Sequence, residues 1–129
     1  MADSIAPLAD LVVLDFTRVL AGPYCTRLLA DLGARVVKVE RAGGGDDMRK
    51  GHLQLEPGRD DQSSYFTRIN VGKESLGLDL GRPETREIVR DLARKADVAV
   101  ENFVLEPEPY DDLRSGVDRR DGAGVTHEG

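Results

Sequence analysis

Cysteine is almost absent from the sequence, since Cys25 is the only one among 129 residues. A single cysteine excludes an internal disulfide framework and suits a reducing compartment, so we expect a cytoplasmic protein. Long hydrophobic runs are missing as well, because no stretch approaches the ~20 apolar residues that a membrane span requires. The first residues, MADSIAPLADL, lack the basic segment followed by an apolar one that marks a secretory signal. We therefore expect neither a membrane partner nor secretion.

Histidine and positive charge are also scarce. The two histidines, His52 and His127, have no cysteine, histidine or carboxylate at ligand spacing, so we expect no metal site. The 18 basic residues are outnumbered by 24 acidic ones, which gives a net charge of -6. Much of this excess lies in residues 104–129, which carry seven acidic residues against three arginines. An acidic chain of this kind argues against nucleic acid as a partner.

What the sequence does contain is enough hydrophobic residues, 40%, for the core of one domain. The stretch from Leu11 to Glu40 has the pattern of a strand, a helix and a second strand. An apolar run, Leu11 to Leu14, is followed by Gly22 and Pro23, and Pro23 suits the first turn of a helix. The predicted core-facing helix stripe, with Cys25 as a small buried side chain, comprises Ala21, Cys25, Leu28, Leu29 and Leu32.

The remainder predicts more elements of the same kind. Residues 43–45 are three glycines and indicate a loop, and residues 48–64 predict a long polar excursion over the surface. Residues 64–70 predict one or two helical turns, residues 76–80 a strand, residues 83–95 a helix and residues 98–103 a strand. The second helix is expected to bury Ile88, Val89, Leu92, Ala93 and Ala96. These elements predict an α/β fold with a mainly parallel sheet and flanking helices.

A strand–helix–strand unit raises the possibility of dinucleotide binding. The turn after the first strand, Asp15 to Gly22, lacks the G-x-G-x-x-G spacing that lets the backbone approach a pyrophosphate. Glu40 ends the second strand and mimics the acidic residue that binds a ribose. Without the glycines, the sequence disfavours an NAD site.

Four blocks of the sequence occur in the same order in one family of enzymes. They read DFTRVLAGPYCTRLLADLGARVVKVER, GGGDD, YFTRINVGKESLGLDL and ADVAVENF. Together they resemble the N-terminal segment of the family III CoA-transferases, which include relatives of formyl-CoA transferase, carnitine-CoA transferase and α-methylacyl-CoA racemase. The resemblance covers about residues 7–103 and implies a partial Rossmann-like half-domain over residues 1–103. Residues 104–129 lack both periodicities and are predicted to be a disordered tail outside the family pattern.

The resemblance implies that one edge of the sheet contacts coenzyme A. Val19, Leu20 and Phe103 would supply an apolar slot for adenine, Asn102 would bind its ring edges, and Arg41 would bind phosphate. Leaving the resemblance aside, Val19 and Leu20 could be core, Arg41 a solvated surface charge and Asn102 the cap of a turn. Asp15 is implied to be structural, and Glu74 replaces one member of a basic pair. The implied CoA contacts are Val19, Leu20, Arg41, Leu78, Asp79, Leu80, Gly81, Asn102 and Phe103.

The nucleophile of the family is an aspartate in a Pro-x-Tyr-Asp-like motif far beyond the Glu-Asn-Phe block. Its carboxylate attacks an acyl-CoA thioester and forms a mixed anhydride. The only local match, Glu108-Pro109-Tyr110-Asp111, is either a coincidence or a motif brought forward by a deletion. We therefore assign no catalytic residue and expect a truncated chain of weak or absent activity.

The sequence thus predicts a CoA-transferase family III protein that acts on an acyl-CoA and a small carboxylic acid, with CoA as its substrate group. Two alternatives stay open: a fragment of an α-methylacyl-CoA racemase-type enzyme and a non-catalytic CoA-binding module. The resemblance implies interlocked homodimers, which need a second domain and a returning C-terminal segment, and we do not expect these 129 residues to supply them.

Overall fold

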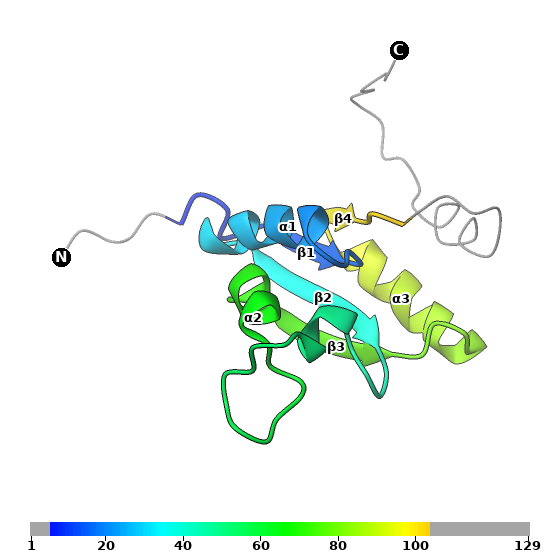
Figure 1. The fold of residues 1–129 in the computed structure, drawn as a ribbon. Helices are drawn as coiled ribbons and strands as arrows, with labels where there is room; N and C mark the ends of the chain where they lie inside the picture. Colours follow the sequence, from blue (N-terminus) through cyan, green and yellow to red (C-terminus); the bar gives the residue numbers. More distant parts are fainter. Residues whose placement is uncertain (1–5, 104–129) are drawn as a thin grey trace, which may run out of the picture.

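The computed structural model describes residues 6–103, which form one sheet with helices packed against it (Figure 1). A strand–helix–strand unit comes first in the chain, and two helix–strand pairs follow a long excursion. The elements in chain order are β1 (Val12–Asp15), α1 (Ala21–Asp31), β2 (Arg35–Arg41), the 3₁₀ helix η1 (Asp47–Lys50), α2 (Ser64–Asn70), β3 (Glu74–Leu78), α3 (Pro83–Lys95) and β4 (Val98–Val100).

All four strands are parallel and lie in the order β3-β2-β1-β4. The chain moves outward from β1 to β2 and β3, and α3 then returns it to the other side of β1. Because crossovers between parallel strands are right-handed, this reversal places α1 and α3 on opposite faces of the sheet. The predicted α/β fold with a mainly parallel sheet and flanking helices is confirmed. The predicted tail, residues 104–129, lies outside the described residues.

The hydrophobic core lies where α1 meets the two central strands. Val13 of β1 and Val36 of β2 are paired in register and are almost fully buried. Ala34, Leu29 and Ala30 pack against them, and Val100 brings β4 into the same cluster. The core therefore ties together the elements whose ends form the site described below.

The face that α1 presents to the sheet differs from the predicted one. Cys25 and Leu28 are exposed, whereas Gly22, Pro23 and Thr26 are buried. The Thr26 hydroxyl donates to the buried carboxylate of Asp15 at 2.6 Å, and this bond sets the helix rotation. The close approach of α1 to the loop after β1 also requires glycine at position 22, because a Cβ there would lie 2.3 Å from Thr17 Cβ. The prediction of a buried Cys25 is wrong, because a polar bond to Asp15 outweighs the apolar stripe.

Two neighbouring leucines of α1 test this orientation. Leu28 is 45% exposed, and Leu29 packs on the core. We expect Leu29→Ala to lower the free energy of unfolding by about 2 kcal/mol, and Leu28→Ala by less than about 1 kcal/mol. Urea denaturation of the two variants measures the difference, and equal losses would contradict the orientation.

Several element ends also differ from the predicted ones. β4 ends at Val100 instead of residue 103, because the Asn102 side chain bonds to the loop after β1. β3 ends at Leu78, before Leu80, and Ile88 of α3 is exposed rather than buried. The helix over residues 83–95 and the turns over residues 64–70 are confirmed. The polar excursion contains η1 and a single bridge between Gln54 and Ser63.

Candidate functional site

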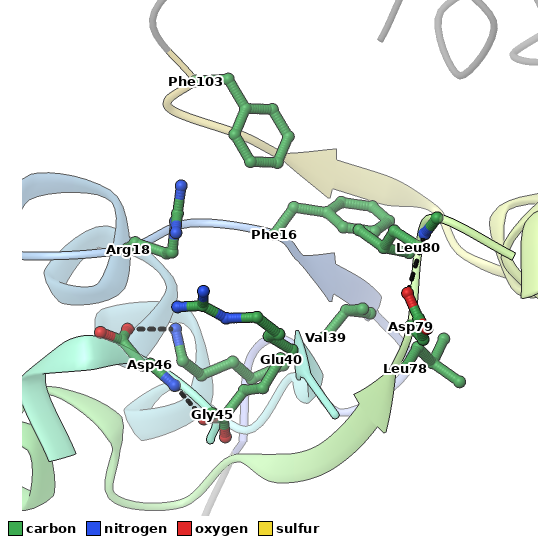
Figure 2. A pocket seen from close by; sticks show the side chains of 13 residues that line it. Phe16, Arg18, Val39, Glu40, Gly45, Asp46, Leu78, Asp79, Leu80 and Phe103 are labelled. Carbon is green, nitrogen blue, oxygen red and sulfur yellow. Dashed lines mark hydrogen bonds and ion pairs between the residues drawn. The ribbon is translucent and has the colours of Figure 1, made fainter. Parts of the chain in front are cut away.

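The carboxyl ends of all four strands meet at one edge of the sheet, where ligands of open α/β sheets bind. A pocket of about 260 Å³ lies there. Figure 2 shows how segments that follow β1, β2, β3 and β4 surround it. The lining residues are Phe16, Arg18, Lys38, Val39, Glu40, Arg41, Gly45, Asp46, Leu78, Asp79, Leu80, Gly81 and Phe103.

The lining combines apolar surface with two exposed arginines. Phe16 and Phe103 carry aromatic rings at the ends of β1 and β4, and Leu80 lies beyond the end of β3 (Figure 2). Arg41 pairs with Asp47 at 2.9 Å in an exposed ion pair. The Arg18 side chain, in contrast, makes no hydrogen bond or ion pair within residues 6–103. An arginine in this position can bind an anion without giving up another partner.

The floor of the pocket is a buried ion pair between Lys38 and Asp46. The Lys38 ammonium donates to the Thr17 carbonyl at 2.7 Å and lies 3.1 Å from the Asp46 carboxylate. The other Asp46 oxygen accepts the Met48 amide at 3.0 Å and caps η1. Both charges therefore hold the loops after β1 and β2 together and are not free for a ligand.

Glu40 is a second buried carboxylate whose bonding capacity is used within the fold. It accepts two hydrogen bonds from Arg49, at 2.7 and 2.6 Å, and one from the Ser75 hydroxyl at 2.7 Å. The Asp46 amide donates to it at 2.8 Å. Burial by itself would raise the pKa of Glu40, but these donors outweigh it and lower the pKa to about 2. Glu40 is thus a structural anion rather than a ribose ligand, which further disfavours an NAD site.

Asp15 anchors a neighbouring buried network. Its carboxylate accepts hydrogen bonds from Thr17 and Thr26 and lies 3.0 Å from the Lys73 ammonium. Burial would raise the pKa of Asp15, but the two hydroxyl donors and Lys73 lower it. Burial in turn lowers the pKa of Lys73 despite its pairing with Asp15. These bonds fit the structural role implied for Asp15. The Lys73 ammonium is likewise bonded within the fold, to Asp15, Pro23 and Asn70.

The sequence that builds this pocket matches a known family over most of the chain. The sequence profile described as CoA-transferase family III matches residues 8–111. This chain belongs to that family. The match ends at residue 111, whereas the predicted family domain ends at residue 103.

Individual relatives agree. A succinyl-CoA:mesaconate CoA-transferase of Haloarcula hispanica is 54% identical over 98 residues, which is 74% of this chain and 24% of the relative. A formyl-CoA:oxalate CoA-transferase of Bradyrhizobium diazoefficiens is 49% identical over 96 residues, 74% of this chain and 22% of the relative. The crystal structure of a CAIB/BAIF family protein from Brucella suis superimposes with a TM-score of 0.72 at 40% identity, covering 85% of this chain and 30% of that one. The chain spans about a quarter of the length of the curated relatives it matches.

The residues implied by the family resemblance fall into two groups. One group lines the pocket: Arg41, Leu78, Asp79, Leu80, Gly81 and Phe103. The other group, Val19, Leu20 and Asn102, lies outside the lining. Val19 and Leu20 are about half exposed on the loop before α1, so neither is core. The Asn102 carboxamide is bonded to the backbone of Arg18.

Sequence reasoning missed several lining residues. Phe16 and Arg18 follow β1 directly, so the rule that ligands bind at the carboxyl ends of strands would have pointed to them. Lys38 and Glu40 were harder to find, because charged residues inside a strand usually face solvent. Only the partners supplied by other loops allow them to be buried here. The remaining lining residues that were missed are Val39, Gly45 and Asp46.

Residues 6–103 show neither a metal cluster nor a membrane-spanning helix. This part of the chain contains no group of three or more histidine, cysteine or carboxylate residues placed to hold a metal ion. It also contains no helix with the length and hydrophobicity needed to cross a bilayer.

Proposed function

We propose that this chain carries the CoA-binding half-site of a family III CoA-transferase. In the whole protein, CoA would pass between an acyl-CoA thioester and a small carboxylic acid through an aspartyl anhydride. The observation that supports the proposal is the pocket itself. It sits at the carboxyl ends of all four strands in a chain of this family, and it combines aromatic surface with two exposed arginines.

The chemistry of the pocket suits the nucleotide end of CoA. Phe16, Leu80 and Phe103 offer apolar surface for an adenine ring, and Arg18 and Arg41 offer positive charge for phosphates. A volume of about 260 Å³ is slightly below the ~300–1,000 Å³ typical of small-molecule sites. The pocket would therefore hold the nucleotide, with the pantetheine arm outside it.

The two buried pocket carboxylates do not suit the covalent step, because Glu40 and Asp46 are bonded within the fold. Asp79 is exposed in the turn after β3, and its Oδ1 accepts the Gly81 amide at 3.1 Å. An anhydride requires a carboxylate that is free to attack a thioester. We therefore propose that these 129 residues alone bind CoA but transfer it weakly or not at all. Asp111 lies outside the described residues.

Calorimetric titration with CoA tests the binding. We expect Arg18→Ala to weaken CoA binding by about tenfold, because a charge-assisted hydrogen bond to phosphate is lost. We expect a smaller loss for Arg41→Ala, because Arg41 must leave Asp47 before it can bind phosphate.

Arg94→Ala is the matched control, because it removes the same charge from an exposed ion pair in the last turn of α3. It should leave CoA affinity unchanged. The proposal fails if the chain releases no heat with CoA, or if it binds NAD as tightly as CoA.

Turnover is tested separately with succinyl-CoA and oxalate or mesaconate, the substrates that the names of the relatives suggest. We expect negligible CoA exchange by the purified chain. Exchange that is lost in Asp111→Ala would contradict the proposed inactivity and would identify Asp111 as the nucleophile.

A further inference from the structure

The side chain of Asn102 joins two loops that lie far apart in the sequence. Its Oδ1 accepts the Arg18 amide at 2.9 Å, and its Nδ2 donates to the Arg18 carbonyl at 2.8 Å. The carboxamide thus satisfies both backbone groups of one residue, as a neighbouring strand would. It continues the contact between β1 and β4 past the end of their ladder, where the Phe16 amide still donates to the Val100 carbonyl.

The residue that follows Arg18 has an unfavourable backbone conformation. Val19 has a φ of 71°, the only positive φ of a non-glycine residue in residues 6–103. A β-branched side chain is disfavoured there, because its Cβ substituents crowd the backbone. On its other side the loop joins α1 through the backbone, where the Leu20 carbonyl accepts the Tyr24 amide at 2.8 Å and no side chain caps the helix. The Asn102 bonds to Arg18 lie immediately before the strained residue.

We propose that Asn102 is a positioning residue that holds the loop of Arg18 and Val19 in this conformation and so aims the Arg18 side chain at the pocket. This inference rests on the proposed CoA site and refines it. Asn102 acts through Arg18, which lines the pocket, whereas Asn102 itself lies outside the lining. In this role its carboxamide, bonded at both ends to the Arg18 backbone, acts on the loop instead of on the adenine ring.

The two bonds from Asn102 to the Arg18 backbone form a clamp on this loop. Removing the clamp should change the populations of the loop conformations. Without the two bonds, Val19 can relax to a negative φ, and the Arg18 backbone turns with it. The apparent dissociation constant rises in inverse proportion to the fraction of molecules that keep the binding conformation. The fold should remain, because both loops are exposed and the core lies elsewhere.

The experiment combines Asn102→Ala with Val19→Gly. Asn102→Ala replaces one uncharged side chain with another, so it leaves the electrostatic attraction for an anionic ligand unchanged. We expect about tenfold weaker CoA binding by calorimetry, faster hydrogen exchange at the Arg18 amide, and an unchanged melting temperature. Glycine adopts a positive φ without strain, so in the Val19→Gly background the same Asn102→Ala substitution should weaken binding much less.

This cycle separates positioning from direct contact. An equal loss of affinity in both backgrounds would show that Asn102 touches the ligand, and no loss in either would show that the clamp is idle. Either outcome overturns the inference. If the Asn102→Ala chain does not fold, Asn102→Asp provides the second variant. It keeps the acceptor for the Arg18 amide and loses the donor to the Arg18 carbonyl, so the loop should again exchange faster.

Failure of the proposed function is distinguishable from failure of this inference. A wild-type chain that binds no CoA would refute the proposed function, and hydrogen exchange at Arg18 would still report on the clamp. A wild-type chain that binds CoA, with exchange at Arg18 unaltered in Asn102→Ala, would refute the clamp alone.

Discussion

Replacing Asp15 with alanine is expected to lower the free energy of unfolding by about 3–5 kcal/mol, the usual cost of removing one partner from a buried ion pair. Asp15 is fully buried and accepts hydrogen bonds from the hydroxyls of Thr17 and Thr26. Its removal leaves the buried ammonium of Lys73 without its nearest carboxylate. The same change weakens the bond that sets the rotation of α1. Urea denaturation monitored by circular dichroism measures the loss.

The control for this prediction is Asp31→Ala, which removes an aspartate from a partly exposed pair with Arg27 within α1. It should cost less than about 1 kcal/mol. The double variant Asp15→Ala/Lys73→Met should lose less unfolding free energy than the sum of the losses in the two single variants. The reason is that it leaves no unpaired buried charge. The account of this network would be wrong if Asp15→Ala cost no more than the control.

The second large effect concerns acid stability and Glu40. The pKa of Glu40 falls from its ordinary value of 4.5 to about 2 in the folded chain, so the folded state binds fewer protons between these values than the unfolded state. The stabilisation is therefore complete above about pH 4.5 and is lost as the pH falls toward 2. The shift corresponds to a loss on the order of 3 kcal/mol. Urea midpoints measured from pH 7 to pH 2 test this.

The variant that isolates this contribution is Glu40→Gln. It should be less stable than the wild type at pH 7, because Arg49 loses its bidentate partner while still lying over the Phe66 ring. Its stability should also vary less with pH between 4.5 and 2. Glu74→Gln is the control, since Glu74 pairs with Arg35 in solvent and should leave the pH profile nearly unchanged. Parallel profiles for the wild type and Glu40→Gln would refute the prediction.

The architecture of this chain could be predicted from its sequence because the signals for it are local. The apolar run before Gly22 and Pro23 indicates a strand entering a helix, and the 3.6-residue period over residues 83–95 gives α3 with its correct bounds. Strands that alternate with helices imply a parallel sheet, and the carboxyl ends of parallel strands meet at one edge. The family resemblance indicated this edge from the sequence, and the pocket lies there.

The tertiary structure decided which side chains meet at that edge and how they are oriented. Cys25 and Leu28 of the predicted apolar stripe are exposed although Leu29 packs on the core, because Thr26 bonds to Asp15 across eleven residues. Asn102 holds Arg18 across 84 residues, and no periodicity records such a pairing. The sequence by itself determined the fold and the sheet edge at which the pocket lies, because helix and strand periods are properties of short segments. Whether a charged side chain is buried, and how it is oriented, depends on partners from distant segments. Those partners come together only when the chain folds.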